Sequence, residues 1–266
     1  MNFPYIIVQP QGGLCNRMRT IAGAYKLAQT INKKLIVFWV RNDELNERFD
    51  NLFVLTPFKV IDDHPGSFIQ KWLWRIANRT DFFTLIDDQT ILNSDFRNSP
   101  ISEWAKELSY SNLLICACHD ITKDCDYSIF KPLDAIRNRC PISKEENVIG
   151  IHIRRTDNVE SVKFSPTELF VQRMNETIDN HGEVKFFLAT DDPKEEAYLQ
   201  EIYGNRIIVN HKTSLDRNNP IAIQEALLDL YTLTQCREIY GSYYSSFSDV
   251  AAIWGGVSKD TIILRA

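Results

Sequence analysis

The chain has 266 residues, of which 44% are hydrophobic and 24% are charged, and its formal net charge at pH 7 is −5. This composition is ordinary for a globular protein of one large or two small domains, and it excludes a disordered chain, a collagen and a coiled-coil rod. No apolar run approaches the roughly 20 residues of a membrane span, and the acidic balance gives no sign of the basic face of a nucleic-acid-binding protein, so we expect neither a transmembrane segment nor nucleic-acid binding.

The first 40 residues predict a strand–turn–helix–strand unit. Apolar and β-branched residues over 5–9 and 35–40 predict two buried strands. Between them, Gly12 and Gly13 mark a turn, and an apolar stripe that begins near Asn16 predicts a helix. This order is the start of a parallel α/β sheet.

The middle of the chain has a weaker pattern. Residues 41–110 are rich in Asn, Asp, Pro and aromatic residues and predict only short helices and loops. A further strand is expected over 113–116, and two prolines within 124–141 predict a linker. We therefore expect an N-terminal lobe over residues 1–141 and a C-terminal lobe over residues 142–266.

The second half alternates strands and helices, which predicts a parallel sheet with helices on both faces. The predicted strands are 148–154, 185–189, 206–209, 238–241 and 261–264. The predicted helices are 165–180, 192–203, 220–235 and a last one that begins near 248. Ser165 is expected to cap the first of these helices, with Pro166 at its first position, and Asp192 is expected to cap the second.

Polar residues gather directly after five predicted strands. Ligands of open parallel sheets bind beyond the carboxyl ends of the strands, so these segments are the candidate site. The segments are 11–17, 154–157, 190–192, 210–212 and 242–246. Their glycines, arginines, carboxylates and clustered hydroxyls are typical of a phosphate-binding site.

The most informative of these segments follows the strand over 148–154. Side chains alternate along a strand, so Gly150, His152 and Arg154 share one face, and Gly150 is expected to leave room beside His152. Arg154 would offer a planar fork for bidentate phosphate binding. The alternative is that Arg154 pairs with Asp157 and that His152 is a satisfied core histidine.

Four other features are ambiguous when each is taken alone. The Gly12–Gly13 turn could cradle a phosphate at a helix N-terminus, or it could be a plain tight turn. A serine among residues 245–248 could hold phosphate or simply cap a helix. Asp191 and Asp192 are compatible with a metal site, but we prefer Asp192 as a helix cap. Asp229 is either a solvated helix edge or a carboxylate that accepts a hydrogen bond from a base.

Together these segments resemble the superfamily of α1,2-, α1,6- and protein O-fucosyltransferases. The stretch Gly150-Ile-His-Ile-Arg-Arg-Thr-Asp157 is similar to the His-x-Arg-Arg-x-Asp signature of the α1,6 branch. The segments 188–193 and 228–230 also resemble that branch, whereas 12–18 and 245–248 resemble the α1,2 branch. The resemblance is good from about Val148 onward and is limited to the first 30 residues before it.

The resemblance implies a GT-B-like fold of two Rossmann-like lobes with parallel sheets. It implies an inverting transferase that needs no metal or other cofactor and that moves fucose from GDP-fucose to a glycan acceptor. Arg154 would hold the β-phosphate and stabilise the leaving GDP, and Arg155 would support it. The other residues of the expected nucleotide-sugar site are Gly12, Gly13, Asn16, His152, Asp191, Asp229, Ser245 and Ser246. His152 and Asp229 would read the guanine, and one of the two serines would hold phosphate.

The sequence departs from the α1,6 pattern just after the signature. Asn158 stands where those enzymes have a basic residue, and the loop toward their proposed catalytic glutamate is one residue shorter. An inverting transfer needs a general base near the acceptor hydroxyl. Glu160 and Asp157 are the nearest candidates, and we predict Glu160.

Other functions stay open at this point. The chain could use a different nucleotide sugar, or it could be a nucleotide- or glycan-binding protein without catalysis. A metal-dependent phosphohydrolase built on Asp191 and Asp192 is a third alternative. The acceptor is expected to bind the N-terminal lobe.

The cysteines and the N-terminus bear on the compartment. The six cysteines are scattered without a C-x-x-C pair, which argues against a zinc ribbon or a thioredoxin-type site. The first five residues lack the basic start and apolar core of a secretory signal. We therefore expect a cytoplasmic protein with free thiols, and we leave peripheral membrane association open.

Overall fold

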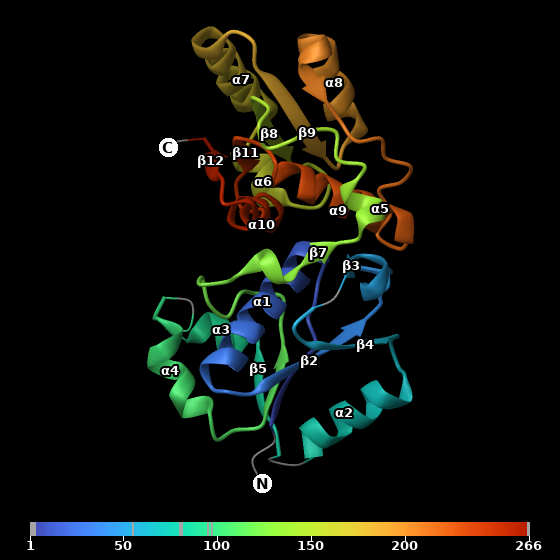
Figure 1. Ribbon diagram of the computed structural model, residues 1–266, viewed down its shortest axis with the longest axis vertical. Coiled ribbons are helices and arrows are strands. Elements are labelled where there is room, and N and C mark those ends of the chain that lie inside the picture. The colour runs from blue at the N-terminus through green and yellow to red at the C-terminus, as the bar shows by residue number, and fades with distance from the viewer. Residues whose placement is uncertain (1–3, 55, 80–81, 95, 97, 265–266) are drawn as a thin grey trace. The chain divides into compact units, whose positions relative to one another are not determined.

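The chain folds into two compact α/β units, shown in the computed structural model of Figure 1. The structure describes residues 4–264 except 55, 80–81, 95 and 97. The first unit comprises Met1–Leu133 and Asp216–Ile223, and the second comprises Asp134–Leu215 and Gln224–Ala266. The main boundary thus lies eight residues before the one expected from the sequence, and a short segment near residue 220 returns to the first unit.

A five-stranded parallel sheet forms the centre of the first unit. Its strand order is β4-β2-β1-β6-β5, so the chain order reverses between β1 and β6. These strands are β1 (Tyr5–Val8), β2 (Lys34–Val40), β4 (Lys59–Asp63), β5 (Thr84–Asp87) and β6 (Leu113–Cys116). Two short strands, β3 (Phe53–Val54) and β7 (Lys131–Pro132), form a separate antiparallel pair.

The helices of the first unit are α1 (Leu14–Thr30), α2 (Phe68–Arg79), α3 (Asp88–Asn93) and α4 (Ile101–Leu108), with 3-10 turns at Phe49–Asn51 and Tyr127–Ile129. The expectation of only helices and loops over 41–110 was therefore wrong for three segments, β3, β4 and β5. All three strands are short, and none alternates clearly. They are strands because they pair with β7, β2 and β6, and a single sequence does not reveal that pairing.

The second unit contains the parallel sheet that the alternating pattern predicted. Its strand order is β10-β9-β8-β11-β12, and the chain order reverses between β8 and β11. The strands are β8 (Val148–Ile153), β9 (Lys185–Thr190), β10 (Ile207–Ile208), β11 (Glu238–Ser242) and β12 (Ser258–Ile262). The helices are α5 (Asp134–Arg137), α6 (Val159–Phe164), α7 (Thr167–His181), α8 (Pro193–Tyr203), α9 (Pro220–Leu233) and α10 (Ser246–Gly255), with a 3-10 turn at Gly204–Arg206.

Helices cover both faces of this second sheet, as predicted. The isoleucines of β8 pack against α7 and α8 in a buried cluster with Phe170, Met174 and Leu199. On the other face, β8 lies against the end of α9 and the start of α10 through Leu233 and Phe247. Because side chains alternate along β8, its isoleucines face α7 and α8, and His152 faces α10.

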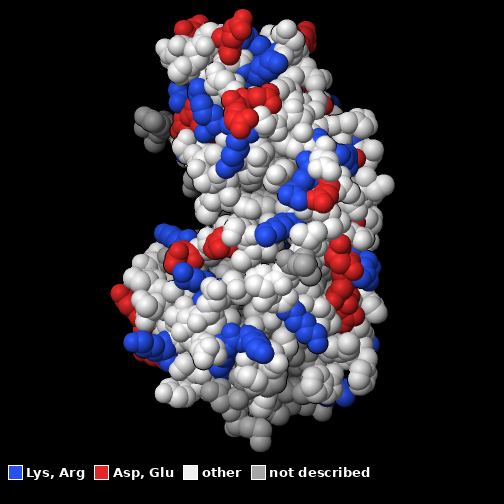
Figure 2. All heavy atoms as spheres, viewed as in Figure 1, with Lys and Arg blue, Asp and Glu red and all other residues white. Residues whose placement is uncertain are grey.

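Charged side chains of both signs are mixed on the surface, in keeping with the near-equal numbers of basic and acidic residues (Figure 2). Figure 2 shows lysine and arginine side chains spread among acidic ones over the face in view. Within the described chain, all six cysteines are free thiols. None of the described helices has both the length and the apolar character needed to cross a bilayer.

Candidate functional site

The reversal point between β8 and β11 joins two of the predicted ligand-binding segments. Arg154 follows β8, and its backbone N–H donates to the Oγ of Ser242 at the end of β11, at 3.0 Å. The Ser242 hydroxyl lies 3.3 Å from the carbonyl oxygen of His152, to which it donates. Reversal points are where parallel α/β sheets bind ligands, so this edge is the candidate site of the second unit.

Two carboxylates hold the Arg154 guanidinium. One terminal nitrogen forms an ion pair with Asp157, and the other lies 3.0 Å from an oxygen of Asp191. The pairing of Arg154 with Asp157 was the alternative left open by the sequence, and the structure contains it. The Arg154 side chain is still 22% exposed.

Asp191 orders the loop that carries Arg154. Its carboxylate accepts hydrogen bonds from the backbone N–H of Arg155 at 2.7 Å and from the hydroxyl of Thr156 at 2.6 Å. Burial pushes the pKa of Asp191 up, but the charge of Arg154 and these hydrogen bonds outweigh it, so the net pKa lies below the usual value. Asp192 caps α8 by accepting from the N–H of Lys194, as predicted. Both aspartates therefore have structural partners, which disfavours a metal site built on them.

Arg155 anchors the same loop from the other side. Its guanidinium donates to the Oγ of Thr167 at 3.1 Å and lies 3.5 Å from a carboxylate oxygen of Glu195. It also lies over the ring of Phe170. Because its side chain is only 11% exposed, Arg155 supports the loop and does not present its charge to solvent.

His152 is buried on the face of β8 that meets α10. Its ring stacks on Phe247, with centroids 4.9 Å apart, and its Nδ1 atom has no hydrogen-bond partner among the described residues. Burial, with a contribution from the Arg154 charge, lowers the pKa of His152 from 6.5 to about 3, so the ring is neutral at pH 7.

Gly150 has a different role from the one expected. A Cβ atom at this position would lie 2.7 Å from Leu233 and 3.2 Å from the sulfur of Cys236. The glycine therefore allows α9 to pack closely on β8, and it does not serve to leave space beside His152.

The loop from β11 to α10 brings the predicted serines to the same edge. Ser245 is buried at the N-cap of α10 but makes no side-chain capping bond, and Ser246 is partly exposed in the first turn. The amide of Asn158 donates to the carbonyl of Tyr244 at 2.8 Å. Asn158, which stands where the α1,6 pattern has a basic residue, thus connects this loop to α6.

Ser165 also stabilises this loop, and its predicted capping role was wrong. Its hydroxyl accepts from the N–H of Tyr243 at 2.8 Å, and α7 begins at Thr167 with Pro166 at the N-cap and no side-chain cap. The hydroxyl binds a residue almost 80 positions away in the chain, and rules for helix caps consider only neighbouring residues.

The two candidate bases occupy different surroundings. Asp157 is half exposed and paired with Arg154. Glu160 is exposed in the first turn of α6. Asp157 therefore positions the arginine, and a role for Glu160 stays a prediction.

Asp229 belongs to a buried polar cluster, so the solvated-edge interpretation was wrong. It accepts from the amide of Asn210 at 2.9 Å and lies 3.2 Å from the ammonium of Lys212. The same ammonium is 3.5 Å from Glu196. Burial raises the pKa of Asp229, and the positive charge of Lys212 counteracts only part of the shift.

In the first unit, the turn after β1 is held by a buried arginine. Gly12 has a φ of +78°, and its N–H donates to a carboxylate oxygen of Glu44 at 3.1 Å. Arg17 donates to the carbonyls of Gly12 and Val40, each at 2.7 Å, and burial lowers its pKa to about 10. Because a carboxylate already occupies the Gly12 N–H, a phosphate cradle is not favoured at this turn.

Gly13 and Asn16 surround the start of α1. Gly13 is the N-cap, with ordinary extended backbone, and a Cβ atom added there would come no closer than 4.0 Å to a neighbouring atom, the Glu44 carbonyl oxygen. Asn16 is partly buried in the first turn of the helix. Gly13 therefore leaves open space at the carboxyl edge of this sheet.

A cavity of about 670 Å³ lies at the opposite edge of the same sheet. It is lined at the amino ends of β1, β2 and β4, with Lys33, Lys34 and Lys59 among its residues. None of the predicted site residues lines this cavity, and ligands of parallel sheets bind at the carboxyl ends instead. We therefore do not assign it to the candidate site.

The sequence analysis missed one pair of polar residues at the carboxyl edge of the first sheet. Asp88 follows β5 directly, and His119 lies three residues after β6; their side chains are in hydrogen-bond contact at 2.6 Å. The strand over 113–116 was predicted, so the residues that follow it could have been included. Asp88 could not be placed because β5 was not recognised.

Comparisons with known proteins identify the fold. No protein-family model matches the chain, and no curated protein sequence matches it significantly. Among solved structures, NodZ α-1,6-fucosyltransferase soaked with GDP-fucose is 20% identical, with 94% of this chain and 92% of that chain covered and a TM-score of 0.62. A mutant of Arabidopsis thaliana FUT1 in complex with GDP is 13% identical over 97% of this chain and 70% of that chain, with a TM-score of 0.60. POFUT1 in its apo form is 10% identical over 98% of this chain and 99% of that chain, with a TM-score of 0.58. The chain therefore has the GT-B-like α/β fold, with its two parallel sheets, that these fucosyltransferases share.

Proposed function

We propose that the protein is an inverting glycosyltransferase that moves fucose from GDP-fucose to a glycan acceptor without a metal ion. The observation that carries the proposal is Arg154 at the reversal point of a Rossmann-like sheet, with a partly exposed side chain. The fold supports it, because the similar solved structures include NodZ with GDP-fucose, NodZ with GDP and FUT1 with GDP.

Arg154 would supply the positive charge that the departing diphosphate needs. Its contact with Asp191 keeps one nitrogen in place, while Asp157 is half exposed and can exchange its ion pair for a phosphate oxygen. A guanidinium fork binds two phosphate oxygens, and its attraction grows as charge develops on the leaving group. Arg155 and Asp191 would hold the loop in the productive conformation.

The N-terminus of α10 would complete the phosphate site. The helix has ten residues, its N-cap residue Ser245 makes no side-chain capping bond, and it follows β11, whose last residue, Ser242, accepts from the backbone N–H of Arg154. Helix N-termini favour anions. Of the two candidate serines, we propose Ser246 for phosphate because Ser245 is buried. His152 and Asp229 keep their proposed roles in the guanine end of the site.

The first unit would bind the glycan acceptor, with Gly12, Gly13 and Asn16 at its carboxyl edge. Glu160 is the base proposed from the sequence. The phosphohydrolase alternative loses support, because Asp191 is held by Arg154 and Thr156 and Asp192 caps α8.

A thermal-shift panel with GDP, GDP-fucose, GDP-mannose, UDP-glucose and NAD, all in EDTA, tests the donor. We expect GDP and GDP-fucose at 100 times their Kd to stabilise the protein by about 2.7 kcal/mol, a shift of several degrees. Arg154→Ala should reduce the shift to about half or less, whereas Arg173→Ala, a partly exposed arginine of α7, should keep it.

Other outcomes would redirect the proposal. A shift with UDP-glucose alone would favour a different nucleotide sugar. A GDP shift without transfer of fucose to any oligosaccharide would favour a binding protein, and no GDP shift would contradict the proposal.

A further inference from the structure

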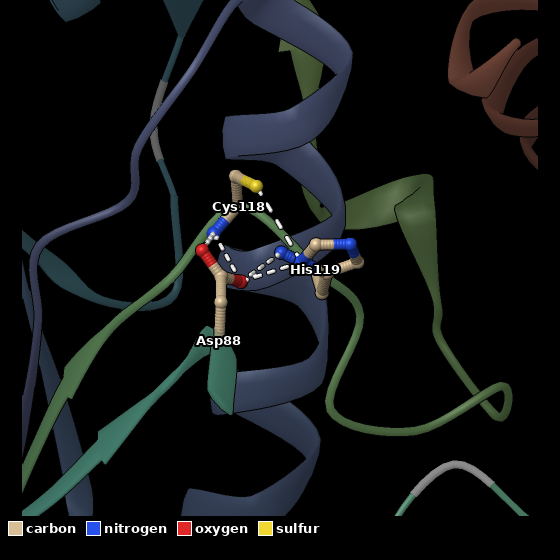
Figure 3. Close-up of side chains that lie close together, drawn as sticks. All are labelled: Asp88, Cys118 and His119. Carbon is tan, nitrogen blue, oxygen red and sulfur yellow. Dashed lines mark hydrogen bonds and ion pairs between the residues drawn. The ribbon is translucent and has the colours of Figure 1, made fainter. Parts of the chain in front are cut away.

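An aspartate–histidine pair lies at the reversal point of the first sheet (Figure 3). His119 follows β6, which lies beside β1, and Asp88 follows β5, which lies beside β6. All three strands are parallel, so their carboxyl ends meet at one edge, where the turn of Gly12 and Gly13 also begins. The pair thus occupies the position in the first unit that Arg154 occupies in the second.

Hydrogen bonds fix the orientation of the His119 ring. Asp88 accepts from the backbone N–H groups of Cys118 and His119, at 3.0 and 3.1 Å, and lies 2.6 Å from the Nδ1 of His119. Burial raises the pKa of Asp88, but the His119 and Cys118 hydrogen bonds more than offset this, so the carboxyl is ionised at pH 7. An ionised carboxylate only accepts hydrogen bonds, so Nδ1 donates to Asp88, and Nε2 is the ring nitrogen left to face a ligand.

Helix α1 holds the same loop in place. The guanidinium of Arg19 donates to the carbonyl of Cys118 at 2.7 Å, and the hydroxyl of Thr20 donates to the carbonyl of His119 at 3.1 Å. The His119 side chain is 23% exposed, and Figure 3 shows its second ring nitrogen pointing away from Asp88. One edge of the imidazole is therefore fixed, and the other remains accessible.

The neighbouring thiol admits two other interpretations, a metal site and a Cys–His nucleophile. Donor atoms of Asp88, Cys118 and His119 lie within 4.8 Å of one another. However, both Asp88 oxygens already accept backbone N–H groups, and burial raises the pKa of the Cys118 thiol to about 11. The Cys118 sulfur also approaches Nδ1, the same nitrogen that faces Asp88, and not the accessible Nε2. These contacts favour an aspartate-supported histidine over both alternatives.

We propose that His119 is the general base for the acceptor hydroxyl and that Asp88 is its positioning residue. The inference rests on the proposed fucosyl transfer and assigns to His119 the role predicted for Glu160. Nε2 takes the hydroxyl proton, the acceptor oxygen forms a bond to the anomeric carbon, and the bond from that carbon to the diphosphate oxygen breaks. The electron pair of that bond leaves with the diphosphate of GDP. The Asp88 carboxylate stabilises the imidazolium that forms.

The chemistry of the two carboxyl edges supports this division of roles. The edge around Arg154 offers a guanidinium and an uncapped helix N-terminus, which suit a diphosphate. The edge around His119 offers an imidazole nitrogen, and a carboxylate, Glu44, occupies the N–H of its glycine turn. That combination suits an uncharged hydroxyl-bearing ligand such as a sugar.

Substitutions in the full-length protein test the proposal through fucose transfer from GDP-fucose to the oligosaccharide that the wild type fucosylates best. His119→Gln should lower kcat about 10²–10⁴-fold with little change in the KM for GDP-fucose. Asp88→Asn should lower kcat less and leave the same KM. The matched control is His64→Gln, because His64 also follows a strand of this sheet and contacts an aspartate, Asp63, at 3.2 Å. It should retain wild-type kcat.

Two further measurements separate the possible failures. If the wild type gives no GDP thermal shift, the proposed function fails; if it binds GDP and His119→Gln keeps full turnover while Glu160→Gln loses it, only this inference fails. Independently of activity, ¹⁵N NMR of the histidine rings should show His119 as the Nδ1–H tautomer, assigned by its absence in His119→Gln. An Nε2–H tautomer, or a stoichiometric Zn²⁺ complex at this ring, would overturn the proposal.

Discussion

Arg154 and Arg155 are adjacent in the sequence but have different surroundings. Arg154 lies between two carboxylates and keeps part of its side chain exposed, whereas Arg155 is almost fully enclosed by α7 and α8 through Thr167 and Glu195. A third arginine, Arg17, is buried under the turn after β1. Only Arg154 combines a positive charge with access from solvent, so the proposed phosphate contact belongs to it alone among the three.

The neutral His152 ring predicts a pH dependence of stability. Its pKa is about 3 in the folded protein and 6.5 in the unfolded chain, so the unfolded state binds the proton first. The contribution is fully present above pH 6.5 and is lost as the pH falls from 6.5 toward 3, at up to about 1.4 kcal/mol per pH unit. Between pH 7 and pH 5 the loss should reach about 2 kcal/mol.

Urea unfolding of the wild type and His152→Phe at pH 7 and pH 5 checks this dependence. Phenylalanine can keep the stacking on Phe247 but does not titrate, so the variant should lose about 2 kcal/mol less than the wild type over this range. An equal loss in both proteins would show that His152 is not the group that titrates.

Several site residues could be chosen from the sequence, but their partners could not. Arg154 and His152 were chosen as candidates because a predicted strand fixed their face and their position at its end. Of the two carboxylates that hold Arg154, only Asp157 could be proposed from the sequence, because Asp191 follows a different strand, β9. The choice between the two interpretations of Asp229 stayed open for the same reason, since its partners Lys212 and Asn210 follow β10.

The two glycines of the turn between β1 and α1 should differ in their tolerance of an added side chain. Gly12 has a φ of +78°, and a Cβ there would lie 2.8 Å from the Asn16 amide, so Gly12→Ala should cost about 1–3 kcal/mol. Gly13 has ordinary backbone and open space, so Gly13→Ala should change stability by less than about 0.5 kcal/mol. Thermal unfolding measures both.

The same pair of variants tests the proposed role of this edge in binding. If a sugar approaches Gly13 closely, Gly13→Ala should raise the KM of transfer while its melting temperature stays unchanged. Unchanged kinetics would remove Gly13 from the proposed site, and a large loss of stability would show that the open space is absent in solution.

Helix α2 is a candidate contact surface for the peripheral membrane association that the sequence analysis left open. Phe68, Ile69 and Trp72 are 82%, 49% and 53% exposed, and Lys71 and Arg75 are exposed beside them. Apolar and aromatic side chains next to cations are typical of helices that lie at a bilayer surface. We expect the protein to bind vesicles of phosphatidylcholine with phosphatidylglycerol.

Co-sedimentation with these vesicles measures the association. The double substitution Phe68→Ser with Trp72→Ser should remove most of it, whereas Tyr110→Ser, at an equally exposed aromatic residue outside α2, should leave it unchanged. Equal sedimentation of the double variant and the wild type would exclude α2 as the contact.

Elements with strong periodicity could be predicted, and elements defined by their partners could not. The buried runs of β1, β2, β8 and β9 and the helix after Asp192 were predicted nearly to their ends. The segments Lys59–Asp63 and Thr84–Asp87 lack such a run and become strands only through neighbouring backbones. Missing β5 also meant missing Asp88, so an error in one element removed a residue from the candidate site.

The two units share an architecture but not a chemistry. Each has a five-stranded parallel sheet with a reversal point, and each reversal point carries polar residues on the loops that follow its strands. In the second unit these include the Arg154 fork, and in the first they include Asp88 and His119. The formal net charge of −5 does not reveal this difference, because it sums all charges and does not show that Arg154 lies at the edge of the second sheet.

Isothermal titration calorimetry of the full chain with GDP in EDTA tests the central claim most directly. It asks whether the unit around Arg154 binds the nucleotide of the donor without a metal ion. We predict saturable one-to-one binding that weakens about 10–100-fold in Arg154→Ala, the loss expected when a hydrogen-bonded charge is removed, and that is unchanged in Arg173→Ala. No binding, binding that requires a divalent cation, or binding unaffected by Arg154→Ala would contradict the account.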